Sequence, residues 1–408
     1  MSYIGNDIIF FSVIRWDEPL AGSAVAVAKE LSKNNRVFFV DRPLSVRDIF
    51  NNYENNSLRK RISSVLFRKN PFLEVQTGFS SFVVCRLGLA LPINFLPAGL
   101  SFDFLNSINS FIVKAAIKRM VKRYHIKEYI YINFFNPVIL PTLSIYGTKN
   151  LLNIYYVTQD IRLSKYMSRH GYKAEVKALA KTDLVLVSSK NQFKRLFSVS
   201  PRLHYFPNAV DYEMFANIRD SEVSPPLDLA NLGSTKVIMF CGYLSEVRID
   251  YQLLKLVCEY FPYYLVVVVG AFDEADIIKY KLDIIPNLLI MGNRRHEAIP
   301  SYLKCAHVAI IPYLCNELNK SVYPLKLNEY LAMGKPVVAT HFSSDLDSFA
   351  EFIYLSGTYQ EFLENIELAL AEKDEKNAQS RIRVAAQNTW EKRVSYLEKL
   401  IEDFTHSA

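Results

Sequence analysis

Short apolar runs alternate with amphipathic stretches along most of the chain. In the N-terminal half, residues 8–14 and 36–41 have the length and composition of strands, and the stretch 21–32 between them has helical spacing. These strand-like runs are continuously apolar, which is typical of a parallel sheet buried on both faces. Further elements of this half are expected as strands at 129–134, 152–157 and 183–188 and as helices at 107–124 and 172–181.

A polar, proline-rich segment interrupts this alternation at 211–235, after which strands and helices resume. The sequence therefore predicts an α/β protein with four parts: an N-terminal domain over 1–210, a linker over 211–235, a C-terminal domain over 236–380, and a last helical segment over 381–408 that packs back toward the N-terminal domain. Ligands bind beyond the carboxyl ends of the strands in open parallel sheets. A cleft between the two domains is therefore the expected site.

Composition narrows the class of protein. Half of the 408 residues are hydrophobic and 22% are charged, enough for large buried cores. The net charge of +7 is too small for a dedicated nucleic-acid binder but suits contact with phosphates or an anionic membrane. The five cysteines include no CxxC pair, so we expect neither a disulfide framework nor a structural zinc site.

No targeting or membrane-spanning segment is expected, and the predicted location is the cytoplasm. The start of the chain lacks the basic region and cleavage site of a signal peptide. The apolar stretch 82–100 is interrupted by Arg86, Pro92 and Pro97, whereas a spanning helix needs about 20 apolar residues in succession. Basic and apolar residues alternate at 59–69 and 114–123. Peripheral contact with a membrane and an ordinary helix with a solvated face both explain that pattern.

The segment 311–340 contains the most informative chemistry. A strand ends near Pro312, a polar loop follows, and a helix opens near Pro324, where a proline fits the first turn. A helix N-terminus binds anions, and Lys326 in that first turn faces the like-signed end of the helix dipole, which a phosphate would explain. Glu329 lies on the same face, where its carboxylate suits a ribose diol. The alternative is that Lys326 and Glu329 form a weak solvated pair.

The sequence YPLKLNEYLAMGKPVVAT at 323–340 resembles the nucleotide-sugar segment of the GT-B glycosyltransferases of the "group 1" (family four-like) superfamily, in the bacterial polysaccharide and teichuronic-acid branch. Other segments are similar to further parts of that family, namely 240–250, 265–270, 291–308, 206–211 and 389–393. The resemblance runs from about residue 155 to the end. It implies two Rossmann-like domains, an inter-domain cleft and a C-terminal crossing helix.

Carried over by position, the resemblance assigns Glu329 to the ribose and Lys326 to the diphosphate, with Arg248 as a second cation. It implies that Gly242 lets the backbone approach the phosphates and that Asn293 and Arg294 lie along the base. The expected donor-binding set also includes residues of the loop before the helix, namely Asn316, Ser321 and Tyr323. Ser321 stands where many retaining members have a first glutamate, which weakens the transfer of a retaining mechanism.

An inverting transfer needs a general base for the acceptor hydroxyl. Asp160, at the end of a predicted strand, is the first candidate, with an N-cap as its alternative role, and Asp17 is the second. The seven histidines are given no role. The resemblance implies no metal and no cofactor, and Asp345-Leu346-Asp347 is interpreted as a cap or turn.

These features predict a metal-independent glycosyltransferase that moves a sugar from a nucleotide diphosphate donor, with UDP favoured. The acceptor is expected to be a surface polysaccharide, such as a capsule or exopolysaccharide, or a lipid-linked glycan. The expected partners are the donor, the acceptor and the cytoplasmic face of a membrane, without nucleic acid. A sugar-nucleotide epimerase of the same architecture and a non-catalytic subunit of a polysaccharide-assembly complex are the alternatives.

Overall fold

The computed structural model describes residues 5–17, 22–44, 70–78, 80–164, 167–230 and 233–406. The chain forms two compact units. Unit 1 consists of Met1–Phe206 with Val394–Ala408, and unit 2 of Pro207–Arg393. Each unit has its own sheet, and helix α15 (Trp390–His406) runs through the boundary between residues 393 and 394.

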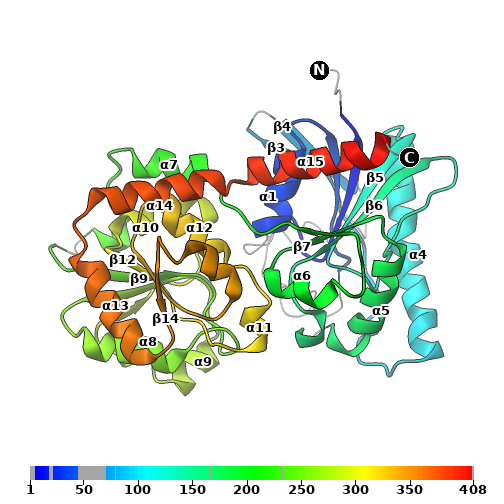
Figure 1. Cartoon of the computed structure of the whole chain (residues 1–408). Helices are drawn as coiled ribbons and strands as arrows, with labels where there is room; N and C mark the ends of the chain where they lie inside the picture. Colours follow the sequence, from blue (N-terminus) through cyan, green and yellow to red (C-terminus); the bar gives the residue numbers. More distant parts are fainter. Residues whose placement is uncertain are drawn as a thin grey trace. The chain divides into compact units, whose positions relative to one another are not determined.

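Unit 1 contains a mostly parallel eight-stranded sheet in the order β3-β4-β2-β1-β5-β6-β7-β8 (Figure 1). β3 and β4 form its antiparallel pair. Its strands are β1 (Asp7–Ser12), β2 (Arg36–Val40), β3 (Phe72–Thr77), β4 (Ser80–Cys85), β5 (Glu128–Phe134), β6 (Lys149–Val157), β7 (Leu184–Val187) and β8 (Leu203–Tyr205). Its helices before α15 are α1 (Gly22–Leu31), α4 (Leu100–Arg123), η1 (Ile161–Leu163), α5 (Ser168–Lys181) and α6 (Lys190–Leu196).

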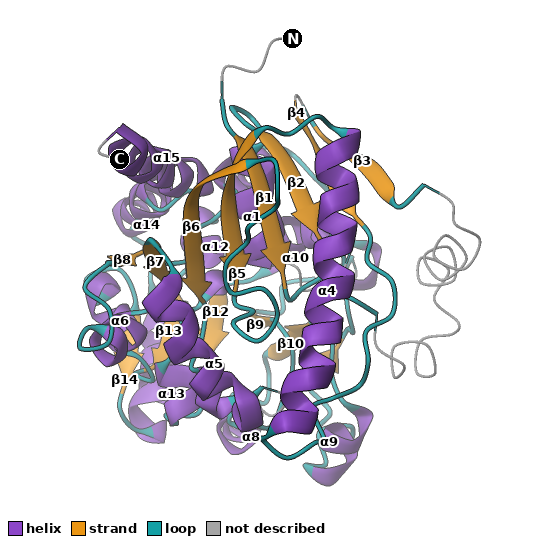
Figure 2. Cartoon of the chain, turned by 90° about the vertical axis from the view of Figure 1, so that its right-hand side faces the viewer, coloured by secondary structure: helices purple, strands orange, loops and turns teal. Residues whose placement is uncertain are grey.

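Successive side chains of the central strands in unit 1 point to opposite faces of the sheet, and because they are apolar, each face has an apolar layer. Ile9 and Phe11 pack with Val113 and Ile117 of α4 in one buried cluster. Figure 2 shows α4 along this face, with α1 on the other side of the sheet. Strands buried on both faces explain why their sequences are continuously apolar.

Unit 2 contains a six-stranded sheet in the order β11-β10-β9-β12-β13-β14, in which every pair is parallel. Its strands are β9 (Val237–Cys241), β10 (Leu265–Val269), β11 (Leu288–Ile290), β12 (Val308–Ile311), β13 (Val337–Thr340) and β14 (Tyr354–Ser356). Its helices before α15 are α7 (Tyr212–Arg219), η2 (Leu227–Leu229), α8 (Tyr251–Tyr260), α9 (Glu274–Lys279), η3 (His296–Ala298), α10 (Ile299–Cys305), α11 (Glu317–Lys320), α12 (Leu325–Ala332), η4 (Ser344–Phe349), α13 (Tyr359–Ala371) and α14 (Glu375–Gln387). The first and fourth strands, β9 and β12, are neighbours at its centre.

The domain boundaries differ from the predicted ones. The expected linker 211–235 contains α7 and η2, and Phe215 and Leu229 are buried in the core of unit 2. The polar, proline-rich composition of this segment gave no indication that these two apolar side chains are buried. The expected last segment is also divided, because α14 belongs to unit 2 and the chain joins unit 1 only from Val394 onward. There the Glu398 carboxylate accepts a hydrogen bond from Asn35 Nδ2 at 2.8 Å.

Two further expectations concern the region before β5. The helix expected at 107–124 begins earlier, at Leu100. The apolar stretch 82–100 forms most of β4 and an irregular segment after it. Among the residues that the structure describes, no helix combines the length and the apolar character that a bilayer crossing requires. The basic segment 59–69 lies outside the described residues.

A buried ion pair joins α14 to the end of α13. The Arg381 guanidinium donates two hydrogen bonds of 2.6 Å to the Glu372 carboxylate, and its Nε donates to the Phe352 carbonyl at 3.0 Å. Both side chains are less than a tenth exposed. Burial raises the pKa of Glu372, but the hydrogen bonds and charge of Arg381 outweigh it and leave that pKa below its usual value.

We expect Arg381→Met to lower the free energy of unfolding by about 3–5 kcal/mol, because the Glu372 charge would remain buried without its partner. The pair stabilises the fold above the unfolded pKa of the carboxyl group and loses this effect as the pH falls through the lower folded pKa. Urea denaturation at pH 7 and at pH 4 measures both effects. Arg383→Met, on an exposed position of the same helix, is the control, and an equal loss in both variants would contradict the prediction.

Candidate functional site

The chain order of the sheet in unit 2 changes direction between β9 and β12. Strands to one side of this point follow β9 in sequence, and strands to the other side follow β12. The loops after these two parallel strands diverge at the same edge of the sheet, which is where open α/β sheets bind ligands. Gly242 follows β9 and Tyr313 lies just after β12, so both belong to this edge.

Lys326 of α12 lies between these two loops. Its Nζ donates a hydrogen bond to the Tyr313 hydroxyl at 2.6 Å. The same atom lies 5.4 Å from the ring centroid of Phe240 and 5.1 Å from that of Tyr313, within cation–π range. The aromatic faces and the hydroxyl therefore hold the ammonium group beside Gly242.

The absence of a side chain at Gly242 makes this placement possible. A Cβ atom there would lie 2.8 Å from Lys326 Cε and 3.0 Å from its Nζ, and the φ angle of 159° is one that other residues rarely adopt. A Cβ at Gly270, after the neighbouring strand β10, would collide with the Gly242 carbonyl. Both glycines let the backbone and the lysine pack closely at this edge.

The start of α12 adds a second source of positive potential. Pro324 precedes the helix and supplies no side-chain hydrogen bond to its first turn, which contains no acidic residue. The backbone N–H groups at the start of α12 and the helix dipole favour an anion at this end. Tyr330 fixes the helix against β9, because its hydroxyl accepts a hydrogen bond from the Cys241 N–H at 2.8 Å and donates one to the Cys241 carbonyl at 3.3 Å.

Glu329 lies one turn after Lys326 and is 7% exposed. Its Oε1 is 2.8 Å from Nε2 of His296, which lies in η3 on the loop after β11. The His296 ring also makes an edge contact with Phe215. Burial lowers the pKa of His296, but the hydrogen bond and charge of Glu329 outweigh it and raise that pKa above its ordinary value.

The structure therefore brings together Gly242, Lys326 and Glu329 from the predicted set, and it adds three residues that the sequence did not nominate. Tyr313, Tyr330 and His296 each contact a predicted residue or the strand beside it. His296 is separated from Glu329 by 33 positions, and a single histidine in a polar loop carries no signal of its partner.

Three other predicted donor-binding residues use their side chains to build the loop before α12. Asn316 caps α11 through the Asn319 N–H and donates to the Val247 carbonyl at 2.9 Å. Ser321 is 1% exposed and donates to the Leu318 carbonyl. Tyr323 is 2% exposed and shares a hydrogen bond with Asn328. For these three side chains the structure favours a supporting role over direct contact with a donor.

The remaining predicted donor-binding residues lie on two loops. Arg248 is half-buried, and its carbonyl accepts a hydrogen bond from Asn319 Nδ2 at 2.9 Å. Asn293 is exposed after β11. Arg294 is bound to Asp228 Oδ2 at 2.9 Å and to the Tyr302 hydroxyl at 2.9 Å. Arg294 thereby links η2 to α10. This contact is structural, whereas the resemblance places Arg294 along the nucleobase of the donor.

Both candidate bases in unit 1 are ion-paired. Asp160 caps η1 by accepting a hydrogen bond from the Arg162 N–H at 3.0 Å, and the Arg162 guanidinium bonds the same carboxylate at 2.6 Å. Burial raises the pKa of Asp160, but the Arg162 hydrogen bonds and the charges of Arg162 and Arg195 outweigh it and lower that pKa. Asp17 accepts a hydrogen bond from Arg15 Nε at 3.0 Å. The capping alternative for Asp160 is therefore observed, and a low pKa disfavours a general base.

Residues 345–347, interpreted from the sequence as a cap or turn, lie in the 3-10 helix η4 and so form part of a turn. Ser343 caps η4 by accepting a hydrogen bond from the Asp345 N–H at 3.3 Å, and Asp345 is buried. Asp347 lies 2.6 Å from His341. Across the part of the chain that the structure describes, no three His, Cys, Asp or Glu side chains gather as metal ligands would.

Part of unit 2 is similar to a known protein family. Residues 235–372 match the family described as "Glycosyl transferases group 1". TuaH of Bacillus subtilis (strain 168), described as a teichuronic acid biosynthesis glycosyltransferase, is 26% identical over 237 residues. This alignment covers 56% of the present chain and 59% of TuaH, so it spans little more than half of either protein.

Solved structures extend the similarity in fold to the whole chain. Sucrose-phosphate synthase from Thermosynechococcus elongatus has a TM-score of 0.66 at 17% identity. The alignment covers 99% of the present chain and 100% of the synthase chain. HepE from Anabaena, in complex with UDP and glucose, has a TM-score of 0.63 at 14% identity, with 98% and 100% covered. An E. coli structure described as trehalose-6-phosphate bound with UDP-2-fluoro glucose has a TM-score of 0.68 at 12% identity, with 98% and 99% covered. The chain therefore has the GT-B fold, its residues 235–372 match the group 1 glycosyl transferases, and the family resemblance predicted from its sequence is confirmed.

Proposed function

We propose that the protein transfers a sugar from a nucleoside diphosphate donor, favouring UDP, to a surface polysaccharide or a lipid-linked glycan. The observation that carries this proposal is the position of Lys326 beside Gly242 and Tyr313, where the order of the sheet reverses. A group 1 glycosyl transferase domain occupies the same residues.

The chemistry of the site suits a diphosphate leaving group. Negative charge grows on the diphosphate as the bond to the anomeric carbon breaks. A lysine and a helix N-terminus that are already in place stabilise this charge without rearrangement. The Glu329 carboxylate would accept hydrogen bonds from the ribose hydroxyls, while His296 holds one of its two oxygens in place. Because Lys326 and α12 supply the positive charge, we propose that transfer is independent of a metal ion.

The proposed donor and acceptor draw on the similar proteins. HepE is described in complex with UDP and glucose, and the E. coli structure with UDP-2-fluoro glucose, which supports UDP as the nucleotide. TuaH is described as acting in teichuronic acid biosynthesis, which supports a cell-surface polymer as the acceptor. An epimerase would consume the donor without an acceptor, and a non-catalytic subunit would not consume it.

We further propose that unit 1 contacts an anionic membrane through α4, consistent with a cytoplasmic enzyme that is peripherally bound. One face of this helix is strongly exposed at Leu100, Phe104 and Phe111. Positions that continue the same helical face carry exposed lysines at 114, 118 and 122. Apolar groups that insert at the headgroup level, next to cations that attract anionic lipids, are typical of interfacial helices.

We expect Lys326→Ala to weaken UDP binding by roughly 10- to 100-fold, because a charge-assisted hydrogen bond contributes about 1.5–3 kcal/mol. Calorimetry with UDP, GDP and a panel of their sugar conjugates, with and without EDTA, measures this change and tests metal independence. Lys320→Ala, which changes an exposed lysine of α11 that pairs with Glu317, is the control. Unchanged UDP affinity in the Lys326 variant would exclude the assignment, and loss of binding in EDTA would exclude metal independence.

The His296–Glu329 pair predicts a pH dependence. Because the folded pKa of His296 is raised, the pair stabilises the fold fully below the unfolded pKa of about 6.5 and loses this effect as the pH rises through the folded value. The difference in Tm between the parent protein and His296→Gln is therefore expected to shrink from pH 6 to pH 9. His341→Gln, which removes the exposed contact with Asp347, is the control. A difference in Tm that grows with pH would contradict this prediction.

The membrane proposal predicts that a triple change of Lys114, Lys118 and Lys122 to Glu weakens binding to phosphatidylglycerol vesicles by at least roughly 100-fold. Each lysine near an anionic surface contributes about 1 kcal/mol. Vesicle co-sedimentation at low and high salt is the measurement.

A matched triple change, Lys33, Lys149 and Lys399 to Glu, alters the net charge of unit 1 equally at other exposed positions. If both triple variants lost vesicle binding equally, net charge alone would explain the loss, and α4 would be excluded as the contact surface.

A further inference from the structure

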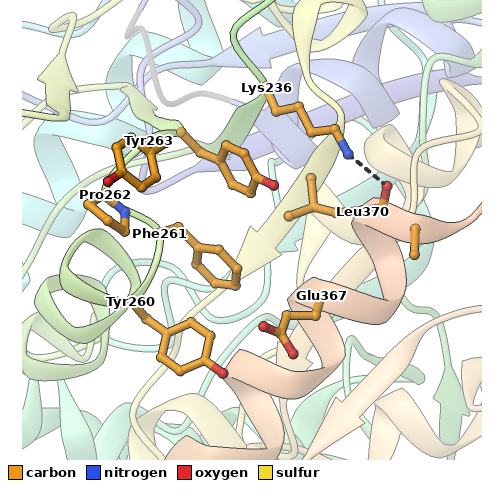
Figure 3. A pocket seen from close by; sticks show the side chains of 9 residues that line it. Lys236, Tyr260, Phe261, Pro262, Tyr263, Glu367 and Leu370 are labelled. Carbon is orange, nitrogen blue, oxygen red and sulfur yellow. Dashed lines mark hydrogen bonds between the residues drawn. The ribbon is translucent and has the colours of Figure 1, made fainter.

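Unit 2 contains a pocket of about 430 Å³ between the segment after α8 and helix α13 (Figure 3). Lys236 of its lining immediately precedes β9, and Tyr264 immediately precedes β10. The pocket therefore lies at the amino ends of these strands, whereas Gly242 and Tyr313 follow carboxyl ends. It is distinct from the proposed donor site, and its volume lies within the roughly 300–1,000 Å³ typical of small-ligand sites.

Four aromatic residues form one side of this pocket. Phe261 is buried and stacks on Tyr264, with ring centroids 5.7 Å apart and an interplanar angle of 15°. Tyr260 meets the edge of Phe261 at 5.0 Å. Tyr263 is 89% exposed, so the core does not use its ring. Phe261 thus anchors the segment while two tyrosine rings remain accessible to a ligand.

Polar groups lie across from these rings. Glu367 projects from α13 toward the Tyr260 hydroxyl (Figure 3) and raises the pKa of that tyrosine. Lys236 Nζ donates a hydrogen bond to the Leu370 carbonyl at 3.2 Å and lies 5.8 Å from the Tyr264 ring centroid. The pocket therefore presents aromatic faces, tyrosine hydroxyls and one carboxylate, while its lysine is bound to the helix.

These groups select among ligand classes. A pyranose has an apolar face of C–H groups and a rim of hydroxyls, so it fits an aromatic ring next to hydrogen-bonding groups that have an apolar body and a polar end. A phosphate or nucleotide would be repelled by the Glu367 carboxylate, and the nearby Lys236 already donates one hydrogen bond to the Leu370 carbonyl. A lipid chain would have to bury that carboxylate at a high cost.

We propose that this pocket is a carbohydrate-binding site, in which Tyr263 and Tyr260 stack on sugar rings and the Glu367 carboxylate accepts hydrogen bonds from sugar hydroxyl groups. That the bound glycan is a segment of the acceptor or product chain rests on the proposed function; that the pocket binds carbohydrate does not. A glycan held there stays attached to the enzyme after one transfer, which raises its effective concentration for the next.

The test uses the full chain and three probes of defined structure: cellopentaose, maltopentaose and tetragalacturonate. Saturation-transfer NMR and calorimetry measure their binding, with UDP as a fourth ligand. We expect at least one oligosaccharide to bind. We expect Tyr263→Ala to weaken this binding by roughly 3- to 10-fold, the range of a single aromatic contact. Because Tyr263 is exposed, the substitution leaves the fold intact.

Glu367→Gln tests the polar side of the pocket and should weaken the same oligosaccharide, whereas UDP affinity should be unchanged in both variants. Tyr146→Ala, at a tyrosine of unit 1 that is 98% exposed, is the matched control and should bind like the parent protein. If no oligosaccharide binds, or if Tyr263→Ala binds as the parent does, the inference is overturned. If UDP fails to bind while an oligosaccharide binds through Tyr263, the donor proposal fails and the carbohydrate site stands.

Discussion

The site in unit 2 depends on how the start of α12 is fixed beside the end of β9. The hydroxyl of Tyr330 bonds both backbone groups of Cys241, and this residue is the last in β9. Because Lys326 lies one turn earlier on the same helix, this anchor sets the height of its ammonium group above the sheet. Glycines after β9 and β10 then allow the close approach that larger residues would prevent. A few fixed backbone contacts therefore determine where the cation lies.

A lysine in the first turn of a helix is unfavourable, because its charge repels the positive end of the helix dipole. Lys326 remains there because Tyr313 accepts its hydrogen bond and two aromatic rings face its charge. The surroundings thus retain a positive charge that the local helix disfavours. Local conflicts of this kind concentrate at functional sites, and an anion that binds at α12 would relieve this one.

The sequence predicted the strand and helix types well, because strands buried on both faces are continuously apolar and because the segment at 323–340 has clear start and stop residues. The family resemblance also assigned Gly242, Lys326 and Glu329 to one site, and the structure brings these three residues together. The sequence did not predict the local partners of polar side chains. The side chains of Asn316 and Ser321 bond to backbone groups three positions away, although both residues are in the predicted donor-binding set. For Asp160 the structure shows the predicted alternative, an N-cap that accepts a hydrogen bond from the Arg162 N–H. Spacing along a chain does not determine rotamers or the choice between several nearby partners.

The two ends of the sheet in unit 2 differ in the chemistry that they expose. At the carboxyl ends, glycines and a helix N-terminus leave room for an anion beside a lysine, and one carboxylate is bound to a histidine. At the amino ends, tyrosine rings lie across a pocket from a carboxylate, and the nearby lysine is bound to a carbonyl. A charged nucleotide fits the first arrangement and an uncharged sugar face fits the second. If both proposals hold, one parallel sheet has a donor site at the carboxyl ends of its strands and a glycan site at their amino ends, because the loops at the two ends carry different side chains.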